Sequence, residues 1–538
     1  MEPSTATDNF KNAVFYGIYP KSFFDSDGDG VGDLKGILSK LPYLVSLGAD
    51  VIVLSSLFET TSEDLFFAPT DLCRVNPAIG TIDDFEELVS KAHESGLKVF
   101  LSFPLSATSV SHPWFEKSKE SVSLNPYREY YTWQVGRKKS PPDNKKTRFK
   151  TPLWSFDAKT NEWYRSFYGE NYPELNYDNP RVRKDISDVF RFWKEKGVDG
   201  FFVENAYFSA RKPLWGAQKP PYKLSEDFFE EGKDLYRILL ALKEKFANEF
   251  PVFIQADAVE PGLYPYLLES EKPVADGLLS ECLLSATRIA CPTSFSLKDF
   301  VKTYLSLQKS PSAERLSVCF EDKDHTRLIS KILSLSDENY LPAAKLLAAM
   351  LLFSVSAPVL YQGEEIGMTD FTFTKSDLRN KGQVDPLLFH SRSAFQWDNV
   401  PHGAFTAAAF SAFPVNENYH KINLLAQSAD PKSVFTFYRR MIAFRKGSSA
   451  IKSGNFKDFS YGNFVCFLRE DQTERLLFIA NPTHKHVNVR TPSEFSNESA
   501  LCEICNYDVV SKTLNQTMGL RPYEVRVFRL KAPLLALN

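Results

Sequence analysis

Two acidic features of this 538-residue sequence, a single glutamate and a loop of aspartates, have the residue types and spacing that could do chemistry. The first is Glu204, at the end of the apolar stretch "DGFFVENA" (residues 199–206). That stretch follows an amphipathic pattern, "RKDISDVFRFWKEKG", and is predicted to be a buried strand that closes a helix-to-strand unit. A carboxylate in this position is either a catalyst or the remnant of one.

The second feature is the acidic loop "DSDGDGVGD" (residues 25–33), which follows the first predicted strand. Its acids alternate in the order of an EF-hand calcium loop, and Gly30 permits the sharp turn. The last position of such a loop is Gly36 here rather than a bidentate glutamate, so the loop is not an EF-hand. We expect structural calcium binding rather than a merely solvated acidic turn. The predicted ligands are Asp25, Asp27, Asp29, Asp33 and the carbonyl of Val31.

The elements that must position these acids are apolar runs that alternate with amphipathic stretches. Eight apolar runs separated by helical patterns predict eight parallel strands, which close into an α/β (β/α)8 TIM barrel with its site at the strand ends. The segment after the third strand is too long for a crossover and is predicted to be an inserted subdomain. Short alternating strands near the C-terminus predict a small antiparallel β-domain. The expected divisions are 1–104 (strands one to three), 105–179 (insertion), 180–450 (remaining barrel) and 451–538 (C-terminal domain).

Charge and composition narrow the classes of partner. Lys plus Arg number 64 and Asp plus Glu 67, and the net charge of -3 provides no field to attract nucleic acid or an anionic membrane. The longest apolar run begins at Leu341 and contains Lys345 and Pro358, which favours a core helix and strand over a membrane span. The polar N-terminal stretch carries no secretion signal, whereas sequons at Asn497 and Asn515 permit an extracellular location.

Several longer motifs resemble the α-amylase superfamily, glycoside hydrolase family 13, and within it the α-glucosidase and oligo-1,6-glucosidase branch. They include "YPKSFFDSDGDGVGDLKGI", "HPWFEKS", "PELNYDNP", "FWKEKGVDGF", "YQGEEIGM" and "FQWDN". The resemblance implies a barrel with a B subdomain after the third strand and a C-terminal β-sandwich. It also makes the acidic loop similar to the family's structural calcium site. Its chemistry is retaining glycoside hydrolysis, with an Asp nucleophile, a Glu acid/base and a second Asp that fixes the sugar.

Carried over residue by residue, the resemblance shows departures at the catalytic positions. Glu204 stands where the family has the Asp nucleophile, and Phe202 replaces the Arg that orients it. The extra methylene of Glu moves the carboxylate oxygens by more than about 1 Å, a displacement that can cost about 100-fold in rate. The acid/base position falls on Ala256 or, with the alignment moved by one residue, on Asp257.

The other sugar-binding positions depart as well. The second Asp survives as Asp324, with Lys323 in place of a sugar-binding His and a matching Arg327 after it. Polar groups that the family uses at the end of the third strand and on its aromatic platform are absent. The residues at those positions are Ser102, Ser106, Ala107, Phe67 and Ala68.

Because these departures affect every catalytic role together, they predict a degenerate site with no catalytic residue. Such a barrel resembles the heavy chains of heteromeric amino-acid transporters. We therefore expect a catalytically inactive, extracellular or cell-surface ectodomain whose partner is a multi-span light-chain transporter, although no membrane helix precedes the barrel in this sequence.

Two alternatives remain open. One is a soluble pseudo-glucosidase that acts in storage or binds a protein, a sugar or an apolar small ligand. Its pocket would be formed by Phe67, Phe202, Lys323 and Arg327. The other is an α-glucosidase with altered catalytic residues, in which Glu204, Asp257 and Asp324 hydrolyse α-glucosides.

Overall fold

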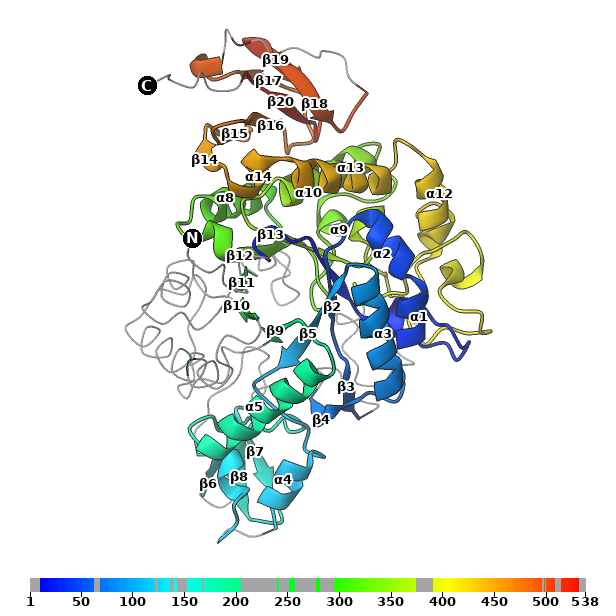
Figure 1. Cartoon of the computed structure of the whole chain (residues 1–538), viewed down its shortest axis with the longest axis vertical. Helices are drawn as coiled ribbons and strands as arrows, with labels where there is room; N and C mark the ends of the chain where they lie inside the picture. The colour runs from blue at the N-terminus through cyan, green and yellow to red at the C-terminus, as the bar shows by residue number, and fades with distance from the viewer. Residues whose placement is uncertain are drawn as a thin grey trace. The chain divides into compact units, whose positions relative to one another are not determined.

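The computed structural model describes most of the chain, and its helices and strands are labelled in Figure 1. The described residues are 10–61, 68–120, 124–135, 140–142, 152–166, 169–204, 240, 251–256, 277–280, 295–373, 390–495, 498, 500–508 and 514–531.

Eight strands form a closed barrel in the spatial order β1-β13-β12-β11-β10-β9-β5-β2. They are β1 (Phe15–Ile18), β2 (Val51–Leu54), β5 (Lys98–Pro104), β9 (Gly200–Glu204), β10 (Val252–Ala256), β11 (Gly277–Ser280), β12 (Leu316–Cys319) and β13 (Ala357–Tyr361). The ladders β5-β9-β10-β11 and β12-β13-β1 are parallel. The predicted TIM barrel and its eight strands are confirmed.

The chain has two compact units, each assembled from several stretches of sequence. The first comprises residues 1–8, 33–39 and 52–281, and the second comprises residues 9–32, 40–51 and 282–538. The predicted division of the sequence at residues 104, 179 and 450 stays a prediction.

In the first unit, helices and small sheets accompany strands β5 and β9. Within the described residues its α-helices are α1 (Leu34–Ser39), α3 (Ile82–Glu94), α4 (Pro113–Ser118) and α5 (Pro180–Glu195). Helix α3 begins with a capping box, in which Thr81 and Asp84 satisfy each other's backbone N–H groups. Helix α5 begins after Asn179, whose side chain accepts from the Arg181 N–H, and has Pro180 as its first residue. These caps fix the starts of the two helices that lead into β5 and β9.

Between β5 and α5 lies the predicted inserted subdomain. Its strands β6 (Trp133–Gln134), β7 (Trp154–Asp157) and β8 (Glu162–Arg165) form a sheet in the order β6-β8-β7. A separate pair, β3 (Phe58–Thr60) and β4 (Pro69–Val75), precedes it in the sequence. Rings from Phe115, Trp133 and Tyr164 pack together and supply an aromatic core for the insertion.

The second unit contains an apolar helix, α10 (Tyr340–Leu352). The other α-helices among its described residues are α2 (Leu41–Leu47), α8 (Leu297–Gln308), α9 (Leu328–Ile332), α12 (Leu424–Ala429), α13 (Val434–Gly447) and α14 (Ser449–Ser453). Helix α10 is buried over most of its length, and its Lys345 donates to the Lys432 carbonyl. This helix and β13 account for the apolar run that begins at Leu341. Within the described part of the chain, no helix has both the length and the apolar character that a membrane crossing requires.

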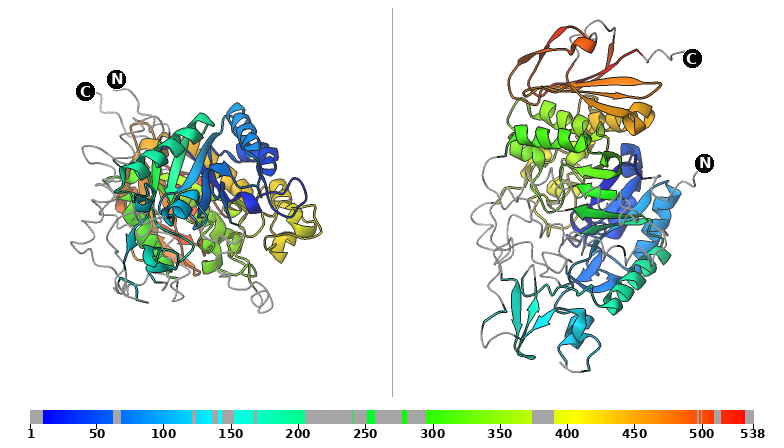
Figure 2. Two further views of the ribbon diagram at one scale, coloured as in Figure 1. Left: turned by 90° about the horizontal axis from the view of Figure 1, so that it is seen from below. Right: turned by 90° about the vertical axis from the view of Figure 1, so that its left-hand side faces the viewer.

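The C-terminal strands are antiparallel, as predicted. A five-stranded sheet has the order β14 (Asn455–Asp458), β15 (Val465–Glu470), β16 (Arg475–Ala480), β20 (Val525–Arg529) and β18 (Leu501–Cys505). A second sheet pairs β17 (Val487–Arg490) with β19 (Thr517–Leu520). One apolar cluster draws side chains from both sheets, among them Leu477, Val489 and Phe528. In Figure 2, helices α13 and α14 of the same unit lie beside these strands.

Candidate active site

Glu204 closes strand β9 and is held by a neighbouring strand. It is 9% exposed, and the Ser102 hydroxyl on β5 donates to its Oε1 over 2.6 Å. The register of the two parallel strands, with Ser102 opposite Phe202 and Pro104 opposite Glu204, places the hydroxyl within reach. Ser102, expected only as a lost polar group, therefore orients the carboxylate.

Phe202 packs in a group of aromatic rings from neighbouring barrel strands. It is 2% exposed, and its ring packs against Phe100 and Phe253 on the two adjacent strands. Gly200 is required beside it, because a Cβ there would lie 2.4 Å from the Phe100 ring. An apolar cluster thus occupies the position where the family resemblance implies an arginine. A ligand role for Phe202 stays a prediction.

The other predicted positions of the first unit are placed only in part. Ser106 and Ala107 are buried where the chain pairs with the end of the insertion, through the Leu175 N–H to Ser106 carbonyl bond and a bridge from Ala107 to Glu174. Ala68 is 4% exposed, and Ala256 ends β10. Phe67 and Asp257 lie outside the described residues, so both acid/base alternatives stay open.

In the second unit, Asp324 lies in the loop after β12, and two cationic side chains bind its carboxylate. Lys323 Nζ lies 2.6 Å from Asp324 Oδ2, and Arg392 Nη2 binds Asp324 Oδ1. The Arg392 Nε donates to the Lys323 carbonyl over 2.8 Å, which ties the arginine to the same loop. Burial alone would raise the pKa of Asp324, but the charges of Lys323 and Arg392 outweigh it and hold the pKa well below its usual value. Asp324 is therefore an ionised carboxylate.

The exposure of these three side chains differs. The side chain of Asp324 is 35% exposed, whereas the side chains of Lys323 and Arg392 are 8% and 2% exposed. A ligand can reach the carboxylate more readily than either cation. Among the described residues, Arg392 is a functional candidate that the sequence reasoning missed. The only signal was its position just before the quoted "FQWDN" motif.

Arg327 lies at the end of the same loop, immediately before α9. It is fully buried, its Nη1 lies 2.9 Å from Glu321 Oε2, and its Nη2 donates to the Gln362 carbonyl. The other oxygen of Glu321 accepts from the Leu328 N–H at the start of α9. A structural role accounts for these contacts, and the ligand-pocket role predicted for Arg327 stays untested.

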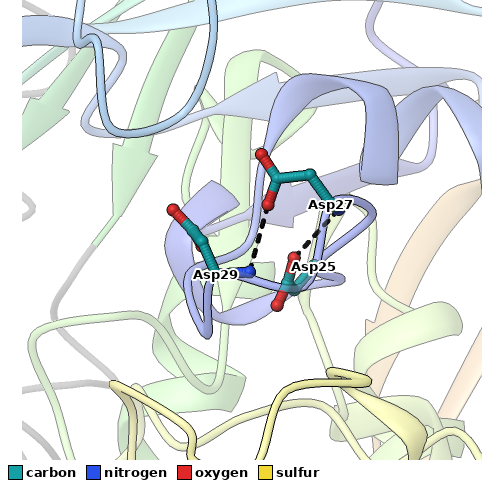
Figure 3. Close-up of side chains that lie close together, drawn as sticks. All are labelled: Asp25, Asp27 and Asp29. Carbon is teal, nitrogen blue, oxygen red and sulfur yellow. Dashed lines mark hydrogen bonds between the residues drawn. The ribbon is translucent and has the colours of Figure 1, made fainter.

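The acidic loop brings three of its predicted ligands together. Carboxylate oxygens of Asp25, Asp27 and Asp29 lie within 4.8 Å of one another (Figure 3). Asp25 is buried and accepts from several backbone N–H groups of its own loop, including those of Gly28 and Gly30. Asp27 and Asp29 are exposed.

Asp33 is engaged differently. Its Oδ1 accepts from the Gly36 N–H at the start of α1, so this carboxylate caps a helix. It is not in the group of close oxygens, which consists of Asp25, Asp27 and Asp29. Calcium binding by the loop stays a prediction.

The comparisons with known proteins decide the family. Residues 17–236 and 281–454 match the model of the alpha amylase catalytic domain. The chain belongs to the alpha-amylase family. Within this family it is 29% identical over 567 residues to the oligo-1,6-glucosidase of Bacillus cereus, covering 97% of this chain and 99% of that protein. It is 30% identical to the trehalose-6-phosphate hydrolase of Escherichia coli over 508 residues, covering 88% of this chain and 90% of that protein.

Solved structures of the alpha-amylase family agree with the barrel described above. The isomaltulose synthase SmuA from Protaminobacter rubrum superposes with a TM-score of 0.87 at 26% identity, over 97% of this chain and 99% of that one. The trehalose-6-phosphate hydrolase of Bacillus licheniformis gives a TM-score of 0.86 at 25% identity, with the same coverage.

These relatives overturn the expected function. The expectation of an inactive transporter heavy chain is wrong, because the proteins that match over nearly their whole length are named as bacterial glucosidases and trehalose-6-phosphate hydrolases. The expected cell-surface location depended on that reading and is wrong for the same reason. The count of missing polar groups took no account of polar neighbours such as Ser102 and Arg392, which come from distant parts of the sequence.

Proposed function

We propose that this member of a glycoside hydrolase family hydrolyses α-glucosides with altered catalytic residues. The observation that carries the proposal is the placement of Glu204, a carboxylate oriented by Ser102 at the end of a barrel strand. TIM-barrel enzymes have their active sites at the carboxyl ends of the strands. The named activities of the relatives support the same substrate class.

In this proposal Glu204 is the nucleophile of a retaining reaction. Its carboxylate attacks the anomeric carbon while the glycosidic C–O bond breaks, and a second acid gives its proton to the leaving oxygen. Water then attacks the glycosyl ester, passes its proton to the same second group, and releases the sugar with retained configuration. We assign the second group to Asp257. The Ser102 hydroxyl orients Glu204 for attack and stabilises the carboxylate that the second step regenerates.

Asp324 has a different role in the proposal. Both of its oxygens are already bound by cations, so it remains ionised and does not transfer protons. An ionised, partly exposed carboxylate accepts hydrogen bonds from sugar hydroxyls, and such bonds strengthen as positive charge develops at the anomeric carbon.

Glucose release tests the proposal directly. Purified protein should release glucose from an aryl α-glucoside, from isomaltose or from trehalose 6-phosphate. Glu204→Gln and Asp257→Asn should each lower the rate by about 1,000-fold or more, because catalytic groups that act as a unit have little partial value. Glu94→Gln, an exposed residue of α3 that pairs with Lys91, is the matched control and should leave the rate unchanged. No release from any of the three substrates, or full activity in Glu204→Gln, would overturn the proposal.

We also propose that the acidic loop binds calcium. Carboxylate oxygens are the ligands that this hard cation prefers, and the grouped oxygens of Asp25, Asp27 and Asp29 fit that chemistry. Calcium at about one hundred times its Kd should stabilise the fold by about 2.7 kcal/mol relative to a chelator. Asp29→Asn should reduce the calcium-dependent rise in the thermal midpoint, and Asp83→Asn on α3 should not. An unchanged midpoint of the wild type in calcium and in chelator would exclude the site.

A further inference from the structure

Lys323 is an unusual residue for its surroundings. It follows strand β12 in a loop where it is 7% exposed, although lysine is rarely buried unless its charge is paired. Its ammonium lies 2.6 Å from Asp324 Oδ2, and its own carbonyl accepts from the Arg392 Nε and from the Ser391 hydroxyl. Side chain and backbone of Lys323 therefore both take part in holding Asp324 and Arg392 together.

We propose that Lys323 is a positioning residue that acts through Asp324, clamping the carboxylate together with Arg392 so that Asp324 presents a fixed, charged acceptor to sugar hydroxyls. The inference rests on the proposed glucosidase function and deepens it. It assigns to Lys323 a role in binding the reacting sugar without contact between the lysine and the sugar.

The geometry of the two cations is the first support. A carboxylate bound through one oxygen can still turn about its terminal torsion, whereas charge-assisted bonds to both oxygens fix its plane. Each oxygen has two lone pairs, so one cation on each leaves acceptor capacity for a ligand. The 35% exposure of Asp324 makes that capacity accessible, and the 8% exposure of Lys323 does not allow the same for the ammonium.

The choice of lysine is the second support. A histidine in this position would lose its charge near pH 6.5, whereas lysine keeps its charge through the whole neutral range. The charged groups that act on Asp324 are Lys323, Arg392 and His325. His325 is itself paired with Asp322 at 2.8 Å, and Asp322 also accepts from the Asp324 N–H. The phenol groups of Tyr19 and Tyr361 also interact with Arg392. With Lys323 in place, the titration of His325 is not what keeps Asp324 charged.

Two substitutions test the proposal. Lys323→Met removes the ammonium but keeps an unbranched chain, and Lys323→Arg keeps a cation. We measure kcat and KM for an aryl α-glucoside at neutral pH. Lys323→Met should lower kcat/KM by about tenfold in the otherwise wild-type protein, but it should have little further effect in an Asp324→Asn background, because the lysine acts through that carboxylate. Lys323→Arg should restore most of the activity. A purely structural role would lower kcat/KM by the same factor in both backgrounds, and that result would overturn the proposal.

A second measurement does not depend on turnover. Asp324 has a folded-state pKa below its unfolded value, so its contribution to stability is present above the unfolded pKa and is lost as pH falls through the folded pKa. In Lys323→Met the folded pKa of Asp324 moves toward its unfolded value, so the free energy of unfolding should fall less between about pH 5 and about pH 2 than in the wild type. In an Asp324→Asn background the substitution should no longer change the pH dependence. Lack of wild-type turnover would refute the proposed function. Identical pH dependence in wild type and Lys323→Met would refute the role of Lys323.

Discussion

The end of β9 and the loop after β12 each hold a carboxylate, but by different means. At the end of β9, Glu204 accepts a hydrogen bond from the neutral hydroxyl of Ser102, and Phe202, two residues earlier on the strand, carries an apolar ring. In the loop after β12, Asp324 is held by the charges of Lys323 and Arg392. The first arrangement fixes direction, and the second fixes both direction and charge.

This difference matters because hydroxyl donors and cations act differently on a titration. A hydroxyl stabilises a carboxylate by a hydrogen bond and contributes no net charge, so burial can still favour the protonated form. A cation within hydrogen-bonding distance adds a Coulomb term that can exceed the desolvation cost, as it does at Asp324. A carboxylate bound by cations, such as Asp324, therefore keeps its charge to a lower pH than its burial alone would allow.

Glu365 is a buried carboxylate that accepts hydrogen bonds from two neutral hydroxyl groups. It follows β13, is fully buried, and its Oε1 accepts from the hydroxyls of Tyr16 and Tyr43. Burial raises the pKa of Glu365 to about 7 in spite of these two hydrogen bonds. Two hydroxyls therefore do not offset the desolvation of this carboxylate.

The largest expected effect that tests the difference between neutral and charged support is the effect of Glu365→Gln on the pH dependence of stability. Because the folded pKa of Glu365 lies above its unfolded value of about 4.5, its contribution to stability is present below that value and is lost as pH rises toward 7. The pKa difference corresponds to about 3 kcal/mol above pH 7. Glu365→Gln removes this titration, so the free energy of unfolding should fall less between pH 4.5 and pH 7.5 than in the wild type.

Denaturant unfolding at a series of pH values measures this slope. Glu417→Gln, which changes an exposed glutamate of the same unit, should keep the wild-type slope. If Glu365→Gln and the wild type show the same dependence on pH, Tyr16 and Tyr43 hold the carboxylate ionised after all, and the distinction between neutral and charged support fails.

The fold was predictable because its signals are local. Each barrel strand is a short apolar run between helical patterns, and α3 begins at Thr81 with the cap and acids that its sequence displays. The inserted subdomain followed from the length of one connection. Such features depend on neighbours in the sequence, so no knowledge of long-range contacts was needed.

The supports of the candidate site were not predictable in the same way. Ser102 and Glu204 are 102 residues apart, and Arg392 and Asp324 are 68 residues apart. No spacing rule links residues at such separations, and only strand register or loop packing brings them together. The family motifs showed which groups were missing from their usual places, but they could not show which groups had come from elsewhere.

A smaller effect is expected from the hydroxyl that supports Glu204. Ser102→Ala removes the donor at 2.6 Å and leaves the carboxylate in place, so the turnover of an aryl α-glucoside should fall by about tenfold, equivalent to about 1.4 kcal/mol. Ser102→Thr keeps a hydroxyl on the same strand and should retain more activity than alanine. Ser118→Ala, another buried serine of the first unit whose hydroxyl bonds to the Phe115 carbonyl, should have no effect on turnover. If Ser102→Ala turns over as fast as the wild type, or if Ser118→Ala loses as much, the Ser102 hydroxyl does not orient Glu204.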